Sequence, residues 1–329
     1  MIQHFGMSPE NQEVLAVTLG SGALTATILT WGATLQNCRL AGHDHPLVLG
    51  FPNMESYLKD SACHGAIAGR VINRISDATL TLEGKTHHLD PNFLNTHTLH
   101  GGHRGYDRRN WQITDHGPNF VDLSLNDPDG HMGFPGTVVV QCRYSLTSAN
   151  ELTIDLHATS DAHTVFNAGH HSYFCLDNSG DIFSHELMIC ADHYLPSRKG
   201  DFPTGDIEAV NNTTFDFRNM RLIEGHYDHN FCLADNRLPP RHVATLRSRL
   251  SGVGMDITTT EPGLQLYTGH HLATTSPGLT GSIDGPFSAL CLEPQMWPDA
   301  PTHSQFPKID LMPSNAYHQH SAFRFYHSA

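Results

Sequence analysis

Alternation of apolar and polar residues runs through almost the whole chain and constrains its fold more than any other feature. Over residues 24–28 and again over residues 152–159, every second residue is apolar. Successive side chains of a β-strand point to opposite faces, so each stretch predicts a strand with one buried face. Helical periodicity never persists beyond about three turns, and helix is expected only in short pieces, such as near Asn53–Lys59. The chain is therefore predicted to be all-β.

Turn residues separate the predicted strands at short, regular intervals. Residues 78–82 and 86–89 flank Glu83-Gly84-Lys85, and residues 138–146 and 151–158 flank a polar turn, so each pair predicts a hairpin. Further strands are expected over residues 120–125 and 255–259. Many short strands of this kind favour a large antiparallel β-sandwich. We find no linker, repeat or low-complexity segment, so residues 1–329 are predicted to form a single domain. The most loop-like stretch is 197–212, and loops and strand ends usually carry the site in such folds.

Charge and composition exclude several classes of protein. The net charge is −14, and the 26 histidines outnumber the 19 lysines and arginines, so no basic stripe is available for nucleic acid. The segment Met1–Gly6 lacks a basic region followed by an apolar run, and no signal peptide is expected. No apolar run approaches the length that crosses a bilayer, so no membrane partner is expected.

The cysteines indicate a reducing compartment. There are seven, an odd number, and they are widely spaced with no Cys-x-x-Cys pair. This spacing fits free thiols in a cytoplasmic protein better than a disulfide framework or a zinc site.

Four isolated acid–base residues stand in short, unusual contexts: His100, His171, Asp228 and Glu293. They are far apart in sequence and can meet only in a folded pocket. Imidazole and carboxylate are the groups that move protons near neutral pH. Their combination predicts proton-transfer chemistry on a small molecule.

Each of these residues also has a purely structural interpretation. His100 precedes two glycines, which fits a solvated turn as well as a pocket. His171 lies in a half-apolar stretch and could be a buried, hydrogen-bonded histidine. It follows His170, and adjacent residues on a strand face opposite sides, so only one of them can point into a given pocket. Glu293 follows a short apolar strand, where desolvation would raise its pKa and suit a general base.

Arg70, Asn73 and Arg74 add polar donors that suit sugar hydroxyls or a carboxylate. An internal salt bridge is the alternative for both arginines and is quite plausible for Arg74. Elsewhere the pairs His43/His45 and His318/His320 are lone H-x-H motifs in polar stretches, so no metal site is expected. No phosphate-binding glycine loop and no Gly-x-Ser-x-Gly elbow is present, which leaves nucleotide cofactors and serine hydrolase chemistry unsupported.

Short motifs recur in a characteristic order from about Gly32 to the C-terminus. They are Gly69-Arg70, Asn73-Arg74-Ile75, Leu99-His100-Gly101-Gly102, Gly105-Tyr106-Asp107-Arg108-Arg109 with Trp111, Asp129-Gly130, Gly133-Phe134-Pro135-Gly136, His171-Ser172-Tyr173-Phe174, Pro203-Thr204-Gly205, Phe215-Asp216-Phe217-Arg218, Tyr227-Asp228-His229-Asn230-Phe231, Pro262-Gly263 with Gln265-Leu266-Tyr267, and Glu293-Pro294-Gln295. Any one of these motifs is weak, but together and in this order they are highly specific. Over this range the chain resembles the aldose 1-epimerase (galactose mutarotase) family.

The resemblance implies a mutarotase-like supersandwich with a sugar cleft on a concave sheet face. It implies an isomerase of carbohydrate metabolism that interconverts the α and β anomers of a free aldose without a cofactor. Glu293 would be the general base and His171 the general acid. The residues that would bind and orient the sugar are Arg70, Asn73, His100, Asp228 and Gln265. The family often has Asn before the catalytic histidine, where this chain has His170.

The chemistry of mutarotation agrees with these residue types. A base takes the proton of the anomeric hydroxyl, an acid protonates the ring oxygen, and the C1–O5 bond breaks and re-forms. Two other interpretations remain open from the sequence: a glycoside hydrolase that uses Asp228 and Glu293, and a non-catalytic carbohydrate-binding protein. The sequence does not select among galactose, glucose, a pentose or an acidic hexose, and it allows a monomer or a homodimer.

Overall fold

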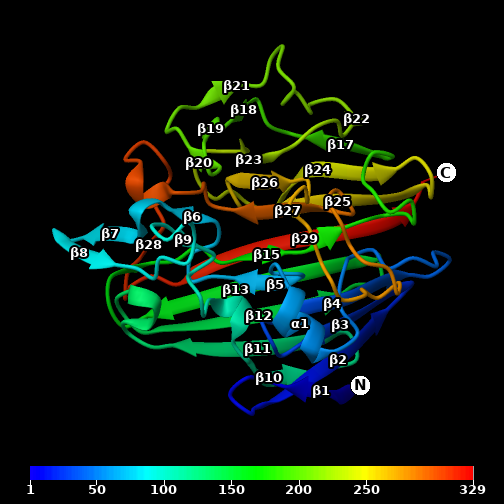
Figure 1. The fold of residues 1–329 in the computed structure, drawn as a ribbon, viewed down its shortest axis with the longest axis horizontal. Helices are drawn as coiled ribbons and strands as arrows, with labels where there is room; N and C mark the ends of the chain where they lie inside the picture. The colour runs from blue at the N-terminus through cyan, green and yellow to red at the C-terminus, as the bar shows by residue number, and fades with distance from the viewer. Residues whose placement is uncertain (329) are drawn as a thin grey trace.

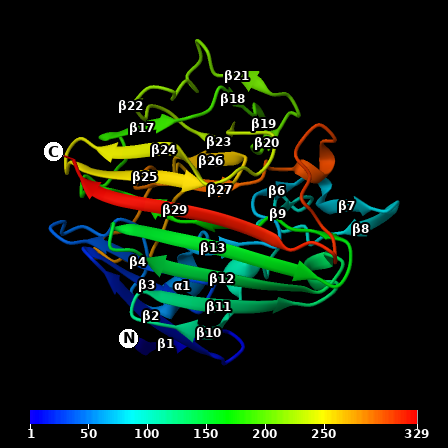
Figure 2. The ribbon, with the colours of Figure 1, turned by 180° about the vertical axis from the view of Figure 1, so that it is seen from behind.

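A computed structural model describes residues 1–328, and strands of three large antiparallel sheets dominate it (Figure 1). The largest sheet is seen broadside in Figure 2. Its order is β10 (Gln112–His116), β11 (Phe120–Asp127), β12 (Val138–Leu146), β13 (Glu151–Ser160), β29 (Tyr317–His327), β25 (Val253–Thr259), β24 (Arg241–Ser248), β17 (His185–Ile189) and β22 (Arg221–Leu222).

Two further sheets complete the main architecture. The six-stranded sheet has the order β16 (Tyr173–Phe174), β27 (Leu290–Gln295), β26 (Gly263–Tyr267), β23 (Asp228–Cys232), β18 (His193–Tyr194) and β21 (Glu208–Ala209). The four-stranded sheet, blue in Figure 1, consists of β1 (Ile2–Met7), β2 (Glu13–Ser21), β3 (Leu24–Leu29) and β4 (Thr34–Leu40).

Short elements connect these sheets. The two-stranded pairs are β5 (Ala66–Ala68) with β15 (Gly169–His171), β6 (Arg74–Ile75) with β9 (Thr98–Leu99), β7 (Thr79–Leu82) with β8 (Lys85–His88), β14 (Thr164–Val165) with β28 (Asp310–Leu311), and β19 (Ser197–Arg198) with β20 (Phe202–Pro203). The helical pieces are α1 (Met54–Asp60) and the 3-10 turns η1 (Ser76–Ala78), η2 (Tyr106–Arg108), η3 (His131–Gly133) and η4 (Ala300–Thr302). Within residues 1–328, no helix is long and apolar enough to cross a membrane.

The strand and helix predictions are confirmed where the periodic signal is strong. The hairpins β7–β8 and β12–β13 form as expected, and α1 begins after Asn53, whose side chain accepts a hydrogen bond from the backbone N–H of Ser56. The stretch 197–212 is less loop-like than expected, because it contributes β19, β20 and β21. Each of these strands has two residues, which is too short to produce an alternation in the sequence.

The six-stranded sheet packs one face against the nine-stranded sheet, which confirms the sandwich. Leu290 and Leu292 of β27 belong to the same buried cluster as Phe323 of β29. The ring of Phe174 in β16 lies 5.4 Å from that of Phe323. Because side chains alternate along a strand, Glu293 points to the opposite face of the six-stranded sheet, away from this shared core.

Candidate active site

A cavity of about 380 Å³ opens on that opposite face of the six-stranded sheet. One part of its wall comes from strands β15, β16, β23, β26 and β27, and the other comes mainly from short elements and loops between residues 61 and 108. Its lining residues are His171, Tyr173, Asp228, Tyr267 and Glu293 from the five strands, and Ser61, Ala62, Cys63, Asn73, Arg74, Asn92, Phe93, Leu99, His100, Gly102, His103, Asp107, Arg108 and His271 from elsewhere.

His171 and Glu293 form a buried acid–base pair in this cavity. The His171 Nε2 atom lies 3.6 Å from Glu293 Oε1, and the side chains are 7% and 2% exposed. This gap is longer than a hydrogen bond, so the two groups face each other without being bonded. Glu293 Oε2 is buried and has no hydrogen-bond partner in residues 1–328.

Burial shifts the two pKa values in opposite directions. It raises the pKa of Glu293 well above its ordinary value; the charge of Asp228 adds to this shift and that of Arg74 opposes it. Burial lowers the pKa of His171 to about 4, partly offset by a backbone hydrogen bond and by Asp228. Both shifts favour uncharged forms. Burial thus favours a neutral carboxyl facing a neutral imidazole, and each of these groups can both donate and accept a proton.

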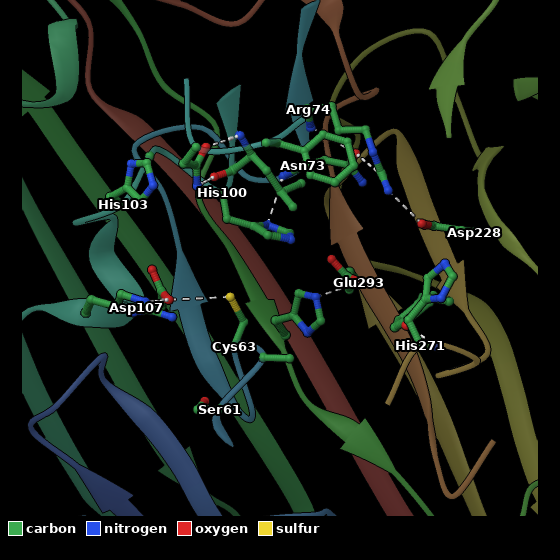
Figure 3. A pocket seen from close by; sticks show the side chains of 18 of the residues that line it. Ser61, Cys63, Asn73, Arg74, His100, His103, Asp107, Asp228, His271 and Glu293 are labelled. Atoms are coloured by element: carbon green, nitrogen blue, oxygen red, sulfur yellow. Dashed lines mark hydrogen bonds and ion pairs between the residues drawn. The ribbon is translucent and has the colours of Figure 1, made fainter. Parts of the chain in front are cut away.

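Asp228 is held by one group that lines the cavity, Arg74, and by one that does not, Gln265. Arg74 donates to Asp228 Oδ2 at 2.9 Å, as Figure 3 shows, and Gln265 Nε2 donates to Oδ1 at 2.6 Å. The strand register brings Gln265 opposite Glu293. Gln265 does not line the cavity and reaches it through Asp228. Two buried atoms here, Arg74 Nε and Gln265 Oε1, have no partner in the described chain, so hydrogen-bonding capacity remains unused around the cavity.

His100 and Asn73 are held together by their backbones. The backbone N–H of Asn73 donates to His100 Nδ1 at 3.2 Å, and that of His100 donates to the Asn73 carbonyl at 2.9 Å. Because Nδ1 accepts, a neutral His100 ring carries its proton on Nε2 and can donate from it. Burial lowers the pKa of His100 well below its ordinary value, which keeps the ring neutral. Gly101 is required here, since a Cβ atom would lie 2.0 Å from the Gly69 carbonyl oxygen.

The prediction that Arg70 binds the sugar is not supported by its position. Arg70 does not line the cavity and is 1% exposed. Its Nε donates to Asp127 Oδ2 at 2.7 Å, and its Nη1 donates to the Pro135 carbonyl at 2.7 Å and to Thr164 at 3.2 Å. Both arginines form the internal salt bridge that the sequence allowed, Arg70 with Asp127 and Arg74 with Asp228, but only Arg74 also lines the cavity. Both arginines have a buried carboxylate partner, and sequence spacing alone could not distinguish them.

His170 and His171 face opposite sides, as strand alternation predicts. His170 Nδ1 lies 3.4 Å from the Tyr144 hydroxyl, and its ring lies 5.8 Å from that of Phe323, both in the nine-stranded sheet. His171 faces the cavity on the other side. His170 is therefore a core residue between the two sheets and does not contact the cavity.

Several cavity residues were not singled out from the sequence. Tyr267 lies two positions after Gln265 and Tyr173 two after His171, so the period of a strand could have indicated them. His271 and Cys63 lie outside the strands, where no periodic signal exists.

Two clusters of residues 1–328 bring potential metal-ligand atoms within 4.8 Å of one another: His171, Cys291 and Glu293, and Cys175, Asp177 and His185. In the second cluster Asp177 accepts hydrogen bonds from the hydroxyls of Ser179, Ser184 and Ser248. The backbone N–H of Leu176 donates to His185 Nε2 at 2.9 Å. The first cluster contains the His171–Glu293 pair of the cavity.

Comparison with known proteins agrees with this geometry. The family model described as aldose 1-epimerase matches residues 16–324. A galactose mutarotase from Rattus norvegicus is 37% identical over 322 residues, covering 93% of this chain and 92% of the relative. An aldose 1-epimerase from Escherichia coli K12 is 33% identical and covers 97% of both chains.

Solved structures share the fold over nearly the full length. An aldose epimerase homologue from C. elegans superimposes with a TM-score of 0.90 at 31% identity, covering 95% of this chain and 99% of the other. A galactose 1-epimerase from Lactobacillus acidophilus has a TM-score of 0.84 at 25% identity and covers 100% and 99% of the two chains.

Proposed function

Because the chain belongs to the aldose 1-epimerase family, we propose that it interconverts the α and β anomers of a free aldose, with galactose as the first substrate to test. The observation that carries the proposal is the buried His171–Glu293 pair, 3.6 Å apart, at the wall of a cavity lined with hydroxyl-binding groups. A cavity of about 380 Å³ falls within the size range typical of small-molecule sites.

In the proposed mechanism Glu293 is the base and His171 the acid. Glu293 takes the proton of the hydroxyl on C1 while His171 Nε2 gives a proton to the ring oxygen O5. The C1–O5 bond breaks, its electron pair stays on O5, and C1 becomes the carbonyl carbon of the open aldehyde. Rotation about the C1–C2 bond exposes the other carbonyl face. Reclosure returns each proton to its origin and yields the other anomer, so no redox change occurs.

The remaining polar groups hold the sugar and its open intermediate. We assign this role to Arg74, Asp228 and His100, which line the cavity, with Gln265 and Asn73 supporting them. Arg74 replaces Arg70 in this set, because its guanidinium reaches the cavity and has an unpartnered Nε. The charge of Arg74 also opposes the raised pKa of Glu293, which favours the ionised base when a substrate is bound.

The glycoside hydrolase interpretation fits the site less well. It requires a second free carboxylate, but both oxygens of Asp228 already accept hydrogen bonds from Arg74 and Gln265.

We further propose that residues 1–329 act as one domain, because buried residues from β2 to β29 belong to a single hydrophobic cluster. Seven free cysteines support a cytoplasmic location.

The test is polarimetry or exchange NMR on freshly dissolved α-anomers of galactose, glucose, arabinose and xylose. We expect faster equilibration with at least one sugar and no release of nitrophenol from nitrophenyl glycosides.

The rate of anomer interconversion should follow a bell-shaped pH profile whose limbs belong to the coupled His171–Glu293 pair. Activity should survive dialysis against a chelator. Equilibration at the uncatalysed rate for every sugar would refute the proposal.

A further inference from the structure

Strand β27 presents two side chains to the imidazole of His171. Cys291 and Glu293 are two residues apart on this strand, so both point to the same face of the sheet. Glu293 faces Nε2 of the ring. Cys291 faces Nδ1, with its Sγ atom at 3.6 Å, a distance suited to a hydrogen bond with sulfur. The His171 ring is thus held between a carboxyl and a thiol.

We propose that Cys291 is a positioning residue: its sulfur accepts a hydrogen bond from Nδ1–H of His171 and thereby fixes the tautomer whose Nε2 exchanges a proton with the sugar. This inference rests on the proposed function of the His171–Glu293 pair and adds a residue to it. Cys291 does not line the cavity, so it acts on the reaction only through His171.

Proton exchange at Nε2 requires this tautomer. After His171 gives its Nε2 proton to O5, the neutral ring must carry its remaining proton on Nδ1. A neutral imidazole has one donor and one acceptor nitrogen, and the partner of one nitrogen decides the role of the other. Among the described residues, the sulfur of Cys291 is the side-chain group within hydrogen-bonding distance of Nδ1, and it acts beside a backbone hydrogen bond of His171. The same N–H···S contact can persist in the imidazolium, so the ring need not turn during the reaction.

A thiol also suits this position electrostatically. Cys291 is 0% exposed, and burial raises its pKa well above the ordinary value, with the charge of Glu293 adding to the effect. The group therefore stays a neutral thiol. A carboxylate at this place would put a second buried negative charge beside Glu293, and an isolated buried charge is costly. Sulfur orients the imidazole without changing the charge of the site.

The chain offers a matched control thiol. Cys175 is buried in the same small hydrophobic cluster as Cys291, together with Tyr173 and Leu272. Its Sγ donates to the backbone carbonyl of Asp177 instead of contacting an imidazole. Replacing Cys175 by alanine therefore removes a similar buried volume without touching His171.

The experiment compares Cys291→Ala, Cys291→Val, Cys291→Ser and Cys175→Ala with the wild-type enzyme. Histidine-labelled protein gives the ¹⁵N shifts of both ring nitrogens, and loss of a signal in His171→Asn assigns those of His171. We expect protonated Nδ1 in the wild type and in Cys291→Ser, whose hydroxyl can accept the same bond. Cys291→Ala and Cys291→Val should show protonated Nε2 and about a tenfold lower kcat, the size typical of losing a group that orients a functional histidine, with KM nearly unchanged.

Three results would overturn the inference. The first is an unchanged His171 tautomer in both Cys291→Ala and Cys291→Val. The second is a switched tautomer in Cys291→Ser. The third is an equal loss of kcat in Cys175→Ala, which would assign the effect to packing. If the wild type accelerates no mutarotation but the Cys291-dependent tautomer is present, the proposed function fails while the orienting contact stands.

Discussion

Two ionic clusters differ in how completely their hydrogen bonds are satisfied. One joins Arg70 to Asp127 and the other joins Arg74 to Asp228, and the two arginines are only four positions apart in sequence. Around Asp127, Arg70 donates at 2.7 Å and Arg109 at 3.1 Å, and the Tyr106 hydroxyl donates at 3.1 Å. Around Asp228, Arg74 and Gln265 donate, but Arg74 Nε and Gln265 Oε1 remain unpartnered. The donors of the first cluster find hydrogen-bond acceptors within the protein, whereas the second cluster keeps unused hydrogen-bonding capacity beside a cavity.

This difference in hydrogen bonding distinguishes a charged cluster that stabilises the fold from one that is available to bind a ligand. A buried polar atom without a partner loses free energy comparable to a lost hydrogen bond, so most proteins avoid it. Near a cavity the missing partner can be a ligand that is bound only part of the time. We therefore interpret the Asp127 cluster as a fixed support for the segment that carries Asn73 and Arg74, and the Asp228 cluster as the sugar-binding side of the site.

The largest effect is expected from breaking the structural cluster. Arg70→Met leaves Asp127 buried with less compensation, so the free energy of unfolding should fall by about 3–5 kcal/mol. Denaturant titration measures this loss. The KM of the remaining folded enzyme should stay near the wild-type value. A large rise in KM with unchanged stability would place Arg70 in the sugar site and reverse the comparison.

Breaking the functional cluster should affect rate instead of stability. Glu293→Gln removes the proposed base and should lower kcat at least about a hundredfold, the low end for one acid–base group. No ion pair of Glu293 with Lys or Arg is lost, so the melting temperature should not fall. Polarimetry and thermal unfolding give the two values. Glu151→Gln, on β13 of the nine-stranded sheet, is the matched control and should leave kcat unchanged. Near-normal turnover in Glu293→Gln would exclude Glu293 as the base.

His170 is a buried residue with an unpartnered atom but no cavity beside it. It therefore tests whether an unpartnered atom alone is enough to indicate a functional site. Its Nε2 has no partner, yet the ring lies in the core. Burial lowers its pKa from 6.5 to about 3, with the charge of His171 contributing. Between these values an unfolded chain binds a proton that the native ring does not, so stability falls as the pH falls, by at most ~1.4 kcal/mol per pH unit.

His170→Asn should therefore flatten the dependence of the unfolding free energy on pH between 6.5 and about 3, while kcat changes little. Denaturant titrations at several pH values measure the slope. The exposed His116 on β10 provides the control for a His→Asn substitution outside the core. A strong loss of activity in His170→Asn would show that the core side of this strand takes part in catalysis.

The smallest effect is expected for Arg74→Lys and tests whether Arg74 binds the sugar. Arg74→Lys keeps the charge beside Asp228 but loses the planar fork of donors, so we expect KM to rise about three- to tenfold with a smaller change in kcat. Initial rates over a range of sugar concentrations separate the two constants. A fall in kcat alone would mean that Arg74 acts in the transition state and does not bind the ground state equally.

The sequence predicted the sandwich because strand alternation reports which face is buried. It indicated that Glu293 ends an apolar strand, whereas β27 continues to Gln295. It also predicted that His170 and His171 face opposite sides. It could not distinguish Arg70 from Arg74, since both are buried and both have an acidic partner far away in sequence, at 127 and 228. The contact between Cys291 and His171 was equally hidden, because 120 residues separate the two positions.

The cavity wall has two structurally different parts. Glu293, His171 and Asp228 stand on strands whose neighbours fix them through the backbone ladder, whereas Ser61–Cys63 and the lining residues Asn92, Phe93, His100, Gly102 and His103 lie in segments that connect strands. Insertions or substitutions in those segments can reshape the entrance without moving Glu293 or His171. Under the proposed function, redesign of a connecting segment can therefore alter sugar preference while the groups that would open the ring stay in place.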